Sequence, residues 1–381
     1  MSRLPQGFLG AGISAGIKSS GNPDLALLVN TGPSHYAAAV FTSNKVVAAP
    51  VTWSRQVVAD NEVAAVLLNS GGANACTGPD GFLDTHKSAE KVARELGISS
   101  ADVVVCSTGL IGERLPMDKL LHGIEVAKAK LSSESAVDCA TAIMTTDSHP
   151  KVFTKESNGI AIFGMAKGAG MLAPSLATML SVIATDAEVS SSAQEIFEEV
   201  VAKTFNRIDS DGCTSTNDTV LFMSSGASGQ SLSDTELYET LFECCDYLAK
   251  ELIGDAEGHS KIVSITTINA QSESDAVEVG RSCARNNLLK CALHGEDPNW
   301  GRVLAAIGTT SATFDPYTID VSLNGVMVCR DSAPGEGRSL VDMKAKEIEI
   351  VIDLKAGSES ATIWTNDLTA MYVHENSAYS S

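Results

Sequence analysis

Short apolar runs separated by turn-forming residues dominate the first 80 positions of the chain. Gly, Pro, Asn and Ser bound these runs, a pattern that predicts strands at 24–30, 36–42 and 63–69. Beyond them, apolar positions recur with helical spacing in some segments and form short continuous runs in others. The predicted helices lie near 82–96, 117–131, 134–144, 192–205, 232–252 and 274–289. The predicted strands lie at 103–106, 179–186, 218–224, 261–270 and in a set from about 302 to 365, and a hairpin over 151–170 turns at 156–159.

The order of these elements indicates the fold class. Helices and strands mix without a regular β-α-β alternation, which favours an α+β fold of packed layers over a doubly wound parallel sheet. With 381 residues, of which 44% are hydrophobic, the chain can bury a large core, and we expect two domains.

Composition excludes several classes of function. The net charge of −20 repels phosphate backbones and no basic stripe offsets it, so we expect no nucleic-acid partner. No apolar run approaches the roughly 18 residues that span a bilayer, and the chain starts without the apolar region of a signal peptide. We therefore expect a cytoplasmic protein with no membrane partner. The nine cysteines form no C-x-x-C pair and the seven histidines show no metal-ligand spacing, which predicts buried thiols and no metal site.

One segment, "GMAKGAGMLAPSLATMLSVIATDA" (164–187), places Thr178 between a run of small residues and a predicted strand. A threonine hydroxyl is a poor nucleophile at neutral pH and needs a nearby base. Cleavage of the bond between Ala177 and Thr178 would supply one, because the new α-amine, with a pKa of about 7.7–8.0, lies on the same residue. The small residues would let the hydroxyl approach the Ala177 carbonyl. The alternative is an ordinary strand start, since threonine favours strands.

Three other positions offer the remaining groups for such chemistry. Thr108 and Gly109 follow a predicted strand, and their turn could direct a hydroxyl and a backbone N–H at a developing oxyanion; the alternative is a simple turn. Lys167 could anchor a carboxylate or depress the pKa of the amine, or it could be a solvated lysine. Glu257 could bind a substrate ammonium group, or it could be a surface acid at a helix end. The glycine-rich segments complete no phosphate-loop pattern, which disfavours nucleotide binding.

Several longer motifs follow one another along nearly the whole chain. The strongest is "AKGAGMLAPSLATML", which is similar to the pattern K-G-S-G-M-I-x-P-N-M-A-T-M-L. The others are "AAAVFTSNKVVAAPV", "LLNSGGANACTG", "STGLIGERLP", "AIMTTDSHPK", "FNRIDSDGCTSTNDT", "HGEDPNWGR" and "NSAYSS". Together they resemble the bifunctional ornithine acetyltransferase / N-acetylglutamate synthase family of arginine biosynthesis.

The resemblance implies an α/β/β/α sandwich with a smaller C-terminal domain. It also implies self-cleavage between Ala177 and Thr178 into an α chain (1–177) and a β chain (178–381), assembled as an α2β2 heterotetramer. Thr178 would take an acetyl group from N2-acetylornithine, release ornithine and pass the acetyl group to glutamate. Thr108 and Gly109 match the oxyanion-hole positions of the family. The positions that match its substrate-binding residues are Thr145, Lys167, Thr178, Glu257, Asn376 and Ser381.

The same resemblance bears on cofactors and on rival functions. No metal or organic cofactor is needed for the transfer, and acetyl-CoA as a second acetyl donor stays open because the family has bifunctional and monofunctional members. The chain departs from the family pattern at Gly72, Ser148, Ser175, 364–366 and Ser381. A rival is an N-terminal-nucleophile amidase or aminopeptidase, which would use the same groups with water as the acceptor. A non-catalytic scaffold is disfavoured, since the hydroxyl at 178 and the lysine at 167 are both present.

Overall fold

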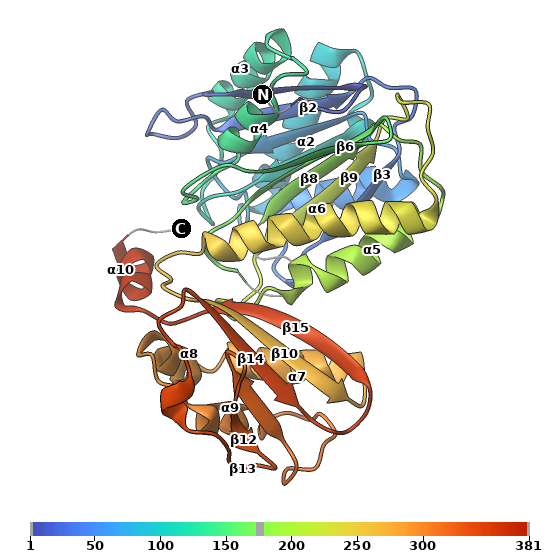
Figure 1. Ribbon diagram of the computed structural model, residues 1–381. Helices are drawn as coiled ribbons and strands as arrows, with labels where there is room; N and C mark the ends of the chain where they lie inside the picture. Colours follow the sequence, from blue (N-terminus) through green and yellow to red (C-terminus); the bar gives the residue numbers. More distant parts are fainter. Residues whose placement is uncertain (1–2, 173–178, 379–381) are drawn as a thin grey trace. The chain divides into compact units, whose positions relative to one another are not determined.

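The computed structural model describes residues 3–172 and 179–378. The chain forms two compact units, the first made of residues 1–206 and 213–255 and the second of residues 207–212 and 256–380 (Figure 1). None of the helices within the described residues is both long and apolar enough to cross a membrane.

Two sheets form the centre of the first unit. The four-stranded sheet has the order β1-β2-β4-β5, and the five-stranded sheet has the order β3-β9-β8-β7-β6. Neighbouring strands are antiparallel except for the parallel pairs β4/β5 and β8/β9. The bounds in the four-stranded sheet are β1 Phe8–Ile13, β2 Leu25–Asn30, β4 Ala65–Asn69 and β5 Val103–Ser107. Those in the five-stranded sheet are β3 Ala37–Phe41, β6 Lys151–Ser157, β7 Ile160–Lys167, β8 Leu180–Thr185 and β9 Thr219–Ser224.

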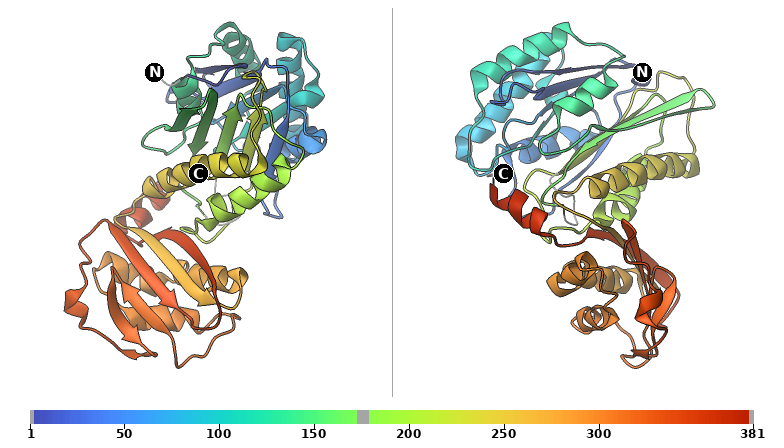
Figure 2. Two further views of the ribbon diagram at one scale, coloured as in Figure 1. Left: turned by 45° about the vertical axis from the view of Figure 1, so that its right-hand side comes forward. Right: turned by 60° about the vertical axis from the view of Figure 1, so that its left-hand side comes forward.

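The sheets pack face to face, and helices cover their outer faces. The core between the sheets includes Phe8, Leu28, Phe163 and Val182. Helices α2 (Gly78–Leu96) and α3 (Met117–Ala129) pack on the four-stranded sheet, while α5 (Ala193–Lys203) and α6 (Asp234–Gly254) pack on the five-stranded one (Figures 1 and 2). The short helices α1 (Ala49–Val57) and α4 (Ala136–Ala142) complete the unit. This layering is the predicted α/β/β/α sandwich, and the α+β prediction is confirmed.

Close packing of α6 depends on one glycine of β7. A Cβ built at Gly164 would lie 2.4 Å from Cys244 Sγ and 3.0 Å from Leu248 Cδ1, both on α6. Any side chain at this position would push the helix off the sheet. The helix starts with a capping box, in which Ser233 and Glu236 satisfy each other's backbone N–H groups.

The second unit contains one six-stranded sheet with the order β13-β12-β11-β14-β10-β15. Its strands are β10 Ile262–Ala270, β11 Asp320–Leu323, β12 Val326–Arg330, β13 Ala333–Pro334, β14 Glu347–Asp353 and β15 Glu359–Asn366. Its helices are α7 Glu273–Ala284, α8 Asn287–His294, α9 Trp300–Ile307 and α10 Ala370–Ala378. Residues such as Ile265, Val279, Val303 and Ile350 form a core between this sheet and helices α7 and α9.

The structure corrects three sequence predictions. The helix predicted at 274–289 is two helices, because the Asn286 side chain accepts the N–H of Leu289 and starts α8. The strands predicted from about 302 start only at 320, because the Asn299 side chain caps a helix over 300–307 instead. A first turn containing Pro50 starts α1 in a region that the pattern assigned to strands and turns.

Candidate active site

The turn after β5 is held in a conformation that requires glycine. Gly109 has φ of +131°, and a Cβ there would lie 2.8 Å from the backbone nitrogen of Gly72. Thr108 donates its N–H to Asn69 O and accepts at its own carbonyl from Gly72 N, both at 3.0 Å. Among the described residues, the Gly109 N–H has no hydrogen-bond acceptor. The turn therefore presents the Gly109 N–H as a backbone donor, while the N–H and the carbonyl of Thr108 are already engaged.

Lys167 ends β7 and donates from Nζ to Thr108 Oγ1 at 3.2 Å. Both side chains are buried, and burial is the main reason that the pKa of Lys167 is lowered. Because Thr108 Oγ1 accepts this bond, its own hydroxyl hydrogen points elsewhere and can donate to another oxygen. An ammonium group behind the hydroxyl also polarises it, which strengthens that donation.

A buried carboxylate, Asp147, joins the segments around Lys167. Its Oδ1 accepts from Gly168 N at 2.7 Å and from Lys151 Nζ at 2.7 Å, and its Oδ2 accepts from Thr145 N at 2.9 Å. Burial acts to raise the pKa of Asp147, but the ammonium groups of Lys167 and Lys151 outweigh it and lower the pKa to about 2. Asp147 is therefore ionised at neutral pH and supplies the negative charge that this cluster of lysines needs.

Lys151 also reaches a second buried acid at the end of α6. Its Nζ lies 2.6 Å from Asp255 Oδ2, and all three side chains of the triad are almost completely buried. Ser148, one of the departures from the family pattern, donates its backbone N–H to Asp255 at 3.0 Å and bonds it through its hydroxyl as well. The serine therefore keeps the hydroxyl function that a threonine would have at this position.

Asp218 and Asn217 contact the same region, although sequence reasoning assigned no role to either. Asp218 Oδ1 accepts the N–H of Met179 at 3.0 Å, and Asn217 Nδ2 donates to Ser107 O at 2.8 Å. In the register of the five-stranded sheet, Leu180 pairs with Lys167 on one side and with Thr219 on the other. The available signal was the polar run "CTSTN" (213–217) directly before the predicted strand at 218–224.

Three predicted positions, Ala177, Thr178 and Ser381, lie outside the described residues. Of the remaining predicted positions, the structure brings Thr108, Gly109, Thr145 and Lys167 together in the first unit. The Thr145 side chain is exposed, and only its backbone N–H is tied to Asp147.

Glu257 and Asn376 belong to the second unit, where neighbouring segments carry them. Gly258, with φ of +60°, packs so tightly on α10 that a Cβ there would lie 2.3 Å from Tyr372 N. Thr369 also donates its hydroxyl to the Gly258 carbonyl. The side chain of Asn376 is exposed and donates to Tyr372 O at 3.0 Å within its own helix. The segment with Glu257 and the helix with Asn376 are thus held against each other.

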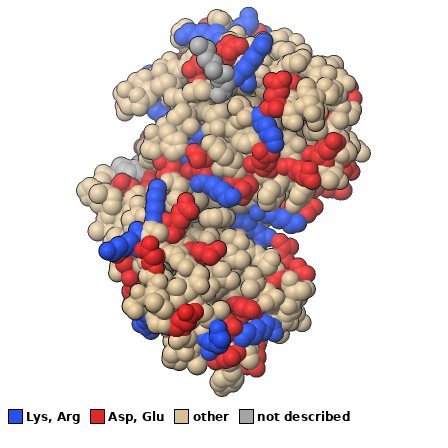
Figure 3. Space-filling model, in the orientation of Figure 1, with Lys and Arg blue, Asp and Glu red and all other residues tan. Residues whose placement is uncertain are grey.

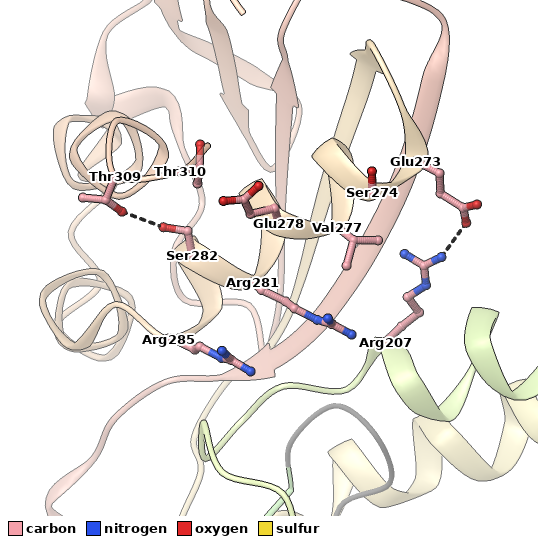
Figure 4. Close-up of a pocket in the computed structure, with 10 residues that line it drawn as sticks. All are labelled: Arg207, Glu273, Ser274, Val277, Glu278, Arg281, Ser282, Arg285, Thr309 and Thr310. Carbon is pink, nitrogen blue, oxygen red and sulfur yellow. Dashed lines mark hydrogen bonds and ion pairs between the residues drawn. The ribbon is translucent and has the colours of Figure 1, made fainter. Parts of the chain in front are cut away.

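Two cavities lie away from these residues. One, of about 850 Å³ in the first unit, is lined by the N-terminal segment, by residues of β6 and β7, and by Asp186. The other, of about 640 Å³ in the second unit, is lined by the side chains in Figure 4, including Arg207, Arg281 and Arg285. Arg207 pairs with Glu273 and Arg285 pairs with Asp209, so this cluster contains its own counter-charges.

Three further features concern metal binding, the cysteines and the surface charge. The described residues contain no group of three or more His, Cys, Asp or Glu side chains that could hold a metal ion. All nine cysteines lie in the described ranges and none forms a disulfide there; Cys76, Cys213 and Cys291 are exposed rather than buried as predicted. On the face in Figure 3, Lys and Arg lie among Asp and Glu and form no continuous basic surface.

In this α+β unit, strand ends gather a hydroxyl, a buried lysine and a glycine turn, groups that acyl-transfer enzymes use to stabilise an oxyanion. The family model described as ArgJ family matches residues 10–381, and the chain belongs to this family. The "Arginine biosynthesis bifunctional protein ArgJ" of Streptomyces coelicolor is 59% identical over 99% of this chain and 98% of its own length. The protein of the same name from Mycobacterium leprae is 51% identical over 99% and 95%.

A solved structure of ornithine acetyltransferase complexed with ornithine, from Mycobacterium tuberculosis, is 50% identical to this chain. It covers 45% of this chain and 93% of its own, with a TM-score of 0.41. Family membership and the curated relatives give the enzyme class: the chain is an acetyltransferase of arginine biosynthesis.

Proposed function

We propose that this chain is a self-processing glutamate N-acetyltransferase that takes its acetyl group from N2-acetylornithine. The precursor cuts itself between Ala177 and Thr178, giving an α chain (1–177) and a β chain (178–381) that assemble as a cytoplasmic α2β2 heterotetramer. The observation that carries the proposal is the buried hydrogen bond from Lys167 to Thr108, with Lys167 paired in the sheet with Leu180, two residues after Thr178 in the sequence.

The transfer has two steps. In the first, the hydroxyl oxygen of Thr178 attacks the acetyl carbonyl of acetylornithine while the α-amine of Thr178 accepts the hydroxyl proton. The amide C–N bond then breaks, the proton goes to the departing nitrogen, and ornithine leaves an acetyl ester on Thr178. In the second step the amine of glutamate attacks this ester, which gives N-acetylglutamate and restores the threonine hydroxyl.

The turn after β5 suits the oxyanion of both steps. The Gly109 N–H and the Thr108 hydroxyl are two donors from adjacent residues, and the hydroxyl is polarised by Lys167. Donors fixed by strand ends need no reorganisation when charge develops, which is the condition for electrostatic catalysis. Lys167 and Thr145 bind the substrate, and Glu257, Asn376 and Ser381 bind its amino and carboxylate ends. No metal or organic cofactor takes part, and acetyl-CoA remains a candidate second donor.

The test is a reaction of purified protein with acetylornithine in the presence and absence of glutamate. We expect stoichiometric ornithine and N-acetylglutamate only when glutamate is added, and two fragments on a denaturing gel. Rapid release of free acetate without glutamate would instead favour an amidase or aminopeptidase. A single full-length band from an active preparation would contradict the processing step.

A further inference from the structure

The residue after Thr178 is held on both sides by the segment that starts β9. Asp218 Oδ1 accepts the N–H of Met179 at 3.0 Å, and the N–H of Thr219 donates to the Met179 carbonyl at 3.2 Å. The segment itself is fixed, because Thr42 donates its N–H to the Asp218 carbonyl at 3.0 Å. The chain immediately following Thr178 therefore has little freedom to shift.

Asn217, the residue before Asp218, connects the segment that starts β9 to the four-stranded sheet. Its Nδ2 donates to Ser107 O at 2.8 Å and to Ala73 O at 2.5 Å, and its side chain is buried. Ser107 directly precedes Thr108. Two consecutive residues therefore bind both sheets. Asp218 binds Met179, which leads into β8 of the five-stranded sheet, and Asn217 binds Ser107, which ends β5 of the four-stranded sheet.

An aspartate is an unusual hydrogen-bond acceptor in a position as buried as that of Asp218. It has no solvent exposure, and its Oδ2 has no hydrogen-bond partner among the described residues. An ionised carboxylate in that position would lose its hydration without replacement. Burial raises the pKa of Asp218 well above its ordinary value, and the hydrogen bonds from Met179 and Ser215 and the nearby Lys167 offset only part of this. Burial therefore favours the uncharged form of this carboxyl group.

We propose that Asp218 is a positioning residue for the nucleophile: it fixes the backbone N–H of Met179, the residue after Thr178, while Asn217 ties the same segment to Ser107, the residue before Thr108. The proposal rests on the proposed function, in which Thr178 supplies both hydroxyl and amine. Only the Cα and the carbonyl carbon of Thr178 separate its α-nitrogen from the nitrogen that Asp218 binds. A negative charge so close would raise the pKa of the α-amine and keep it protonated, whereas a neutral carboxyl leaves it free to act as a base.

Two substitutions separate this role from an electrostatic one. Asp218→Asn keeps a carbonyl oxygen for the Met179 N–H and adds no charge, so kcat should stay within about threefold and the pH profile of kcat/KM should not move. Asp218→Ala removes the acceptor, and kcat should fall on the order of 10²-fold with KM within about threefold, because small misplacements of reacting groups are costly. Rates are measured per mole of processed chain, quantified on denaturing gels.

Asp186 provides a matched control at the opposite end of β8. It is also buried, and it accepts the N–H of Ala161 at 2.8 Å. Asp186→Ala should lower the melting temperature much as Asp218→Ala does, yet leave kcat per processed chain within about threefold of the original value. Equal losses of kcat in both alanine variants would mean general destabilisation and would overturn the proposal. If Asp218→Ala does not fold, Asp218→Asn still decides: a large loss of kcat or a shifted pH profile refutes a role confined to positioning the Met179 N–H.

A Thr178→Ala variant measured in parallel distinguishes failure of the inference from failure of the function. If Thr178→Ala is still processed and transfers acetyl groups, the proposed function fails whatever the Asp218 variants do. If Thr178→Ala is inactive while Asp218→Ala behaves normally, only the role of Asp218 is rejected.

Discussion

Replacing Lys151 by methionine would remove the ammonium group that joins two buried carboxylates of the first unit. Lys151 Nζ lies 2.7 Å from Asp147 and 2.6 Å from Asp255, and the side chains are 0%, 0% and 8% exposed. Breaking a buried ion pair by removing one partner costs about 3–5 kcal/mol, because the other charge is left uncompensated. For a unit of this size, that corresponds to a fall of roughly 6–20 °C in melting temperature.

The matched control is Lys155, on the same strand β6. Its partner Glu243 and its own side chain are about half exposed, so Lys155→Met should change stability by less than about 1 kcal/mol. Both variants are measured by thermal unfolding monitored by circular dichroism at pH 7. Equal melting temperatures for Lys151→Met and Lys155→Met would refute the claim that the buried triad stabilises the unit.

The effect of Lys151→Met should also depend on pH in a defined direction. The folded pKa of Asp147, about 2, lies below the ordinary value of 3.8, so its ionised form stabilises the fold above about pH 4. This contribution disappears as the pH falls from about 4 towards 2. Without Lys151, ionisation of the Asp147 carboxyl group stabilises the fold less. The difference in free energy of unfolding between the original protein and Lys151→Met should therefore become smaller as the pH falls from about 4 towards 2. A difference that stays constant from pH 7 to pH 3 would argue against the assignment.

Three further predictions concern the chemistry. Thr178→Ala should leave one full-length chain on a denaturing gel, because no hydroxyl remains to attack the Ala177 carbonyl; efficient cleavage would contradict the mechanism. Thr108→Ala should lower kcat on the order of 10²–10³-fold with little change in KM, and Thr108→Ser should recover much of the rate; normal turnover of the alanine variant would exclude Thr108 from the site. Deleting residues 376–381 should leave processing intact but lower kcat/KM about tenfold to over a hundredfold, since a lost hydrogen bond to a charged group costs roughly 1.5–3 kcal/mol; an unchanged kcat/KM would return the tail to a passive role.

Much of the fold could be predicted because strand and helix periods are local. The strand predicted at 179–186 is observed at 180–185, and the long helix predicted at 232–252 is observed at 234–254. The errors occur where one polar residue decides between alternatives. The sequence "WGRVLAAI" is apolar enough for a strand or a helix, and the capping side chain of Asn299 favours the helix.

The predicted site was less complete, because its connections are not local. Lys151 and Asp147 stand in a quoted motif, but nothing in the sequence shows that Asp255, 104 residues away from Lys151, completes their triad. Likewise, Asn217 looks like a turn residue and Asp218 like the first residue of a strand. Their role depends on which strands are neighbours in the sheet, and a pattern of apolar positions does not specify neighbours.

The meeting of Thr108 and Lys167 nevertheless follows from alternation along two strands. In β5, Val104 and Cys106 face the space between the sheets, so Thr108 continues the same face. In β7, Phe163 and Met165 face that space, so Lys167 continues it from the opposite sheet. A lysine in that position must find partners, because an unpaired ammonium group among apolar side chains is costly. Thr108 and the charge of Asp147 supply them. Thr108 and Lys167 therefore each follow core-facing residues along one strand. The packing of those core residues fixes the distance between the two side chains.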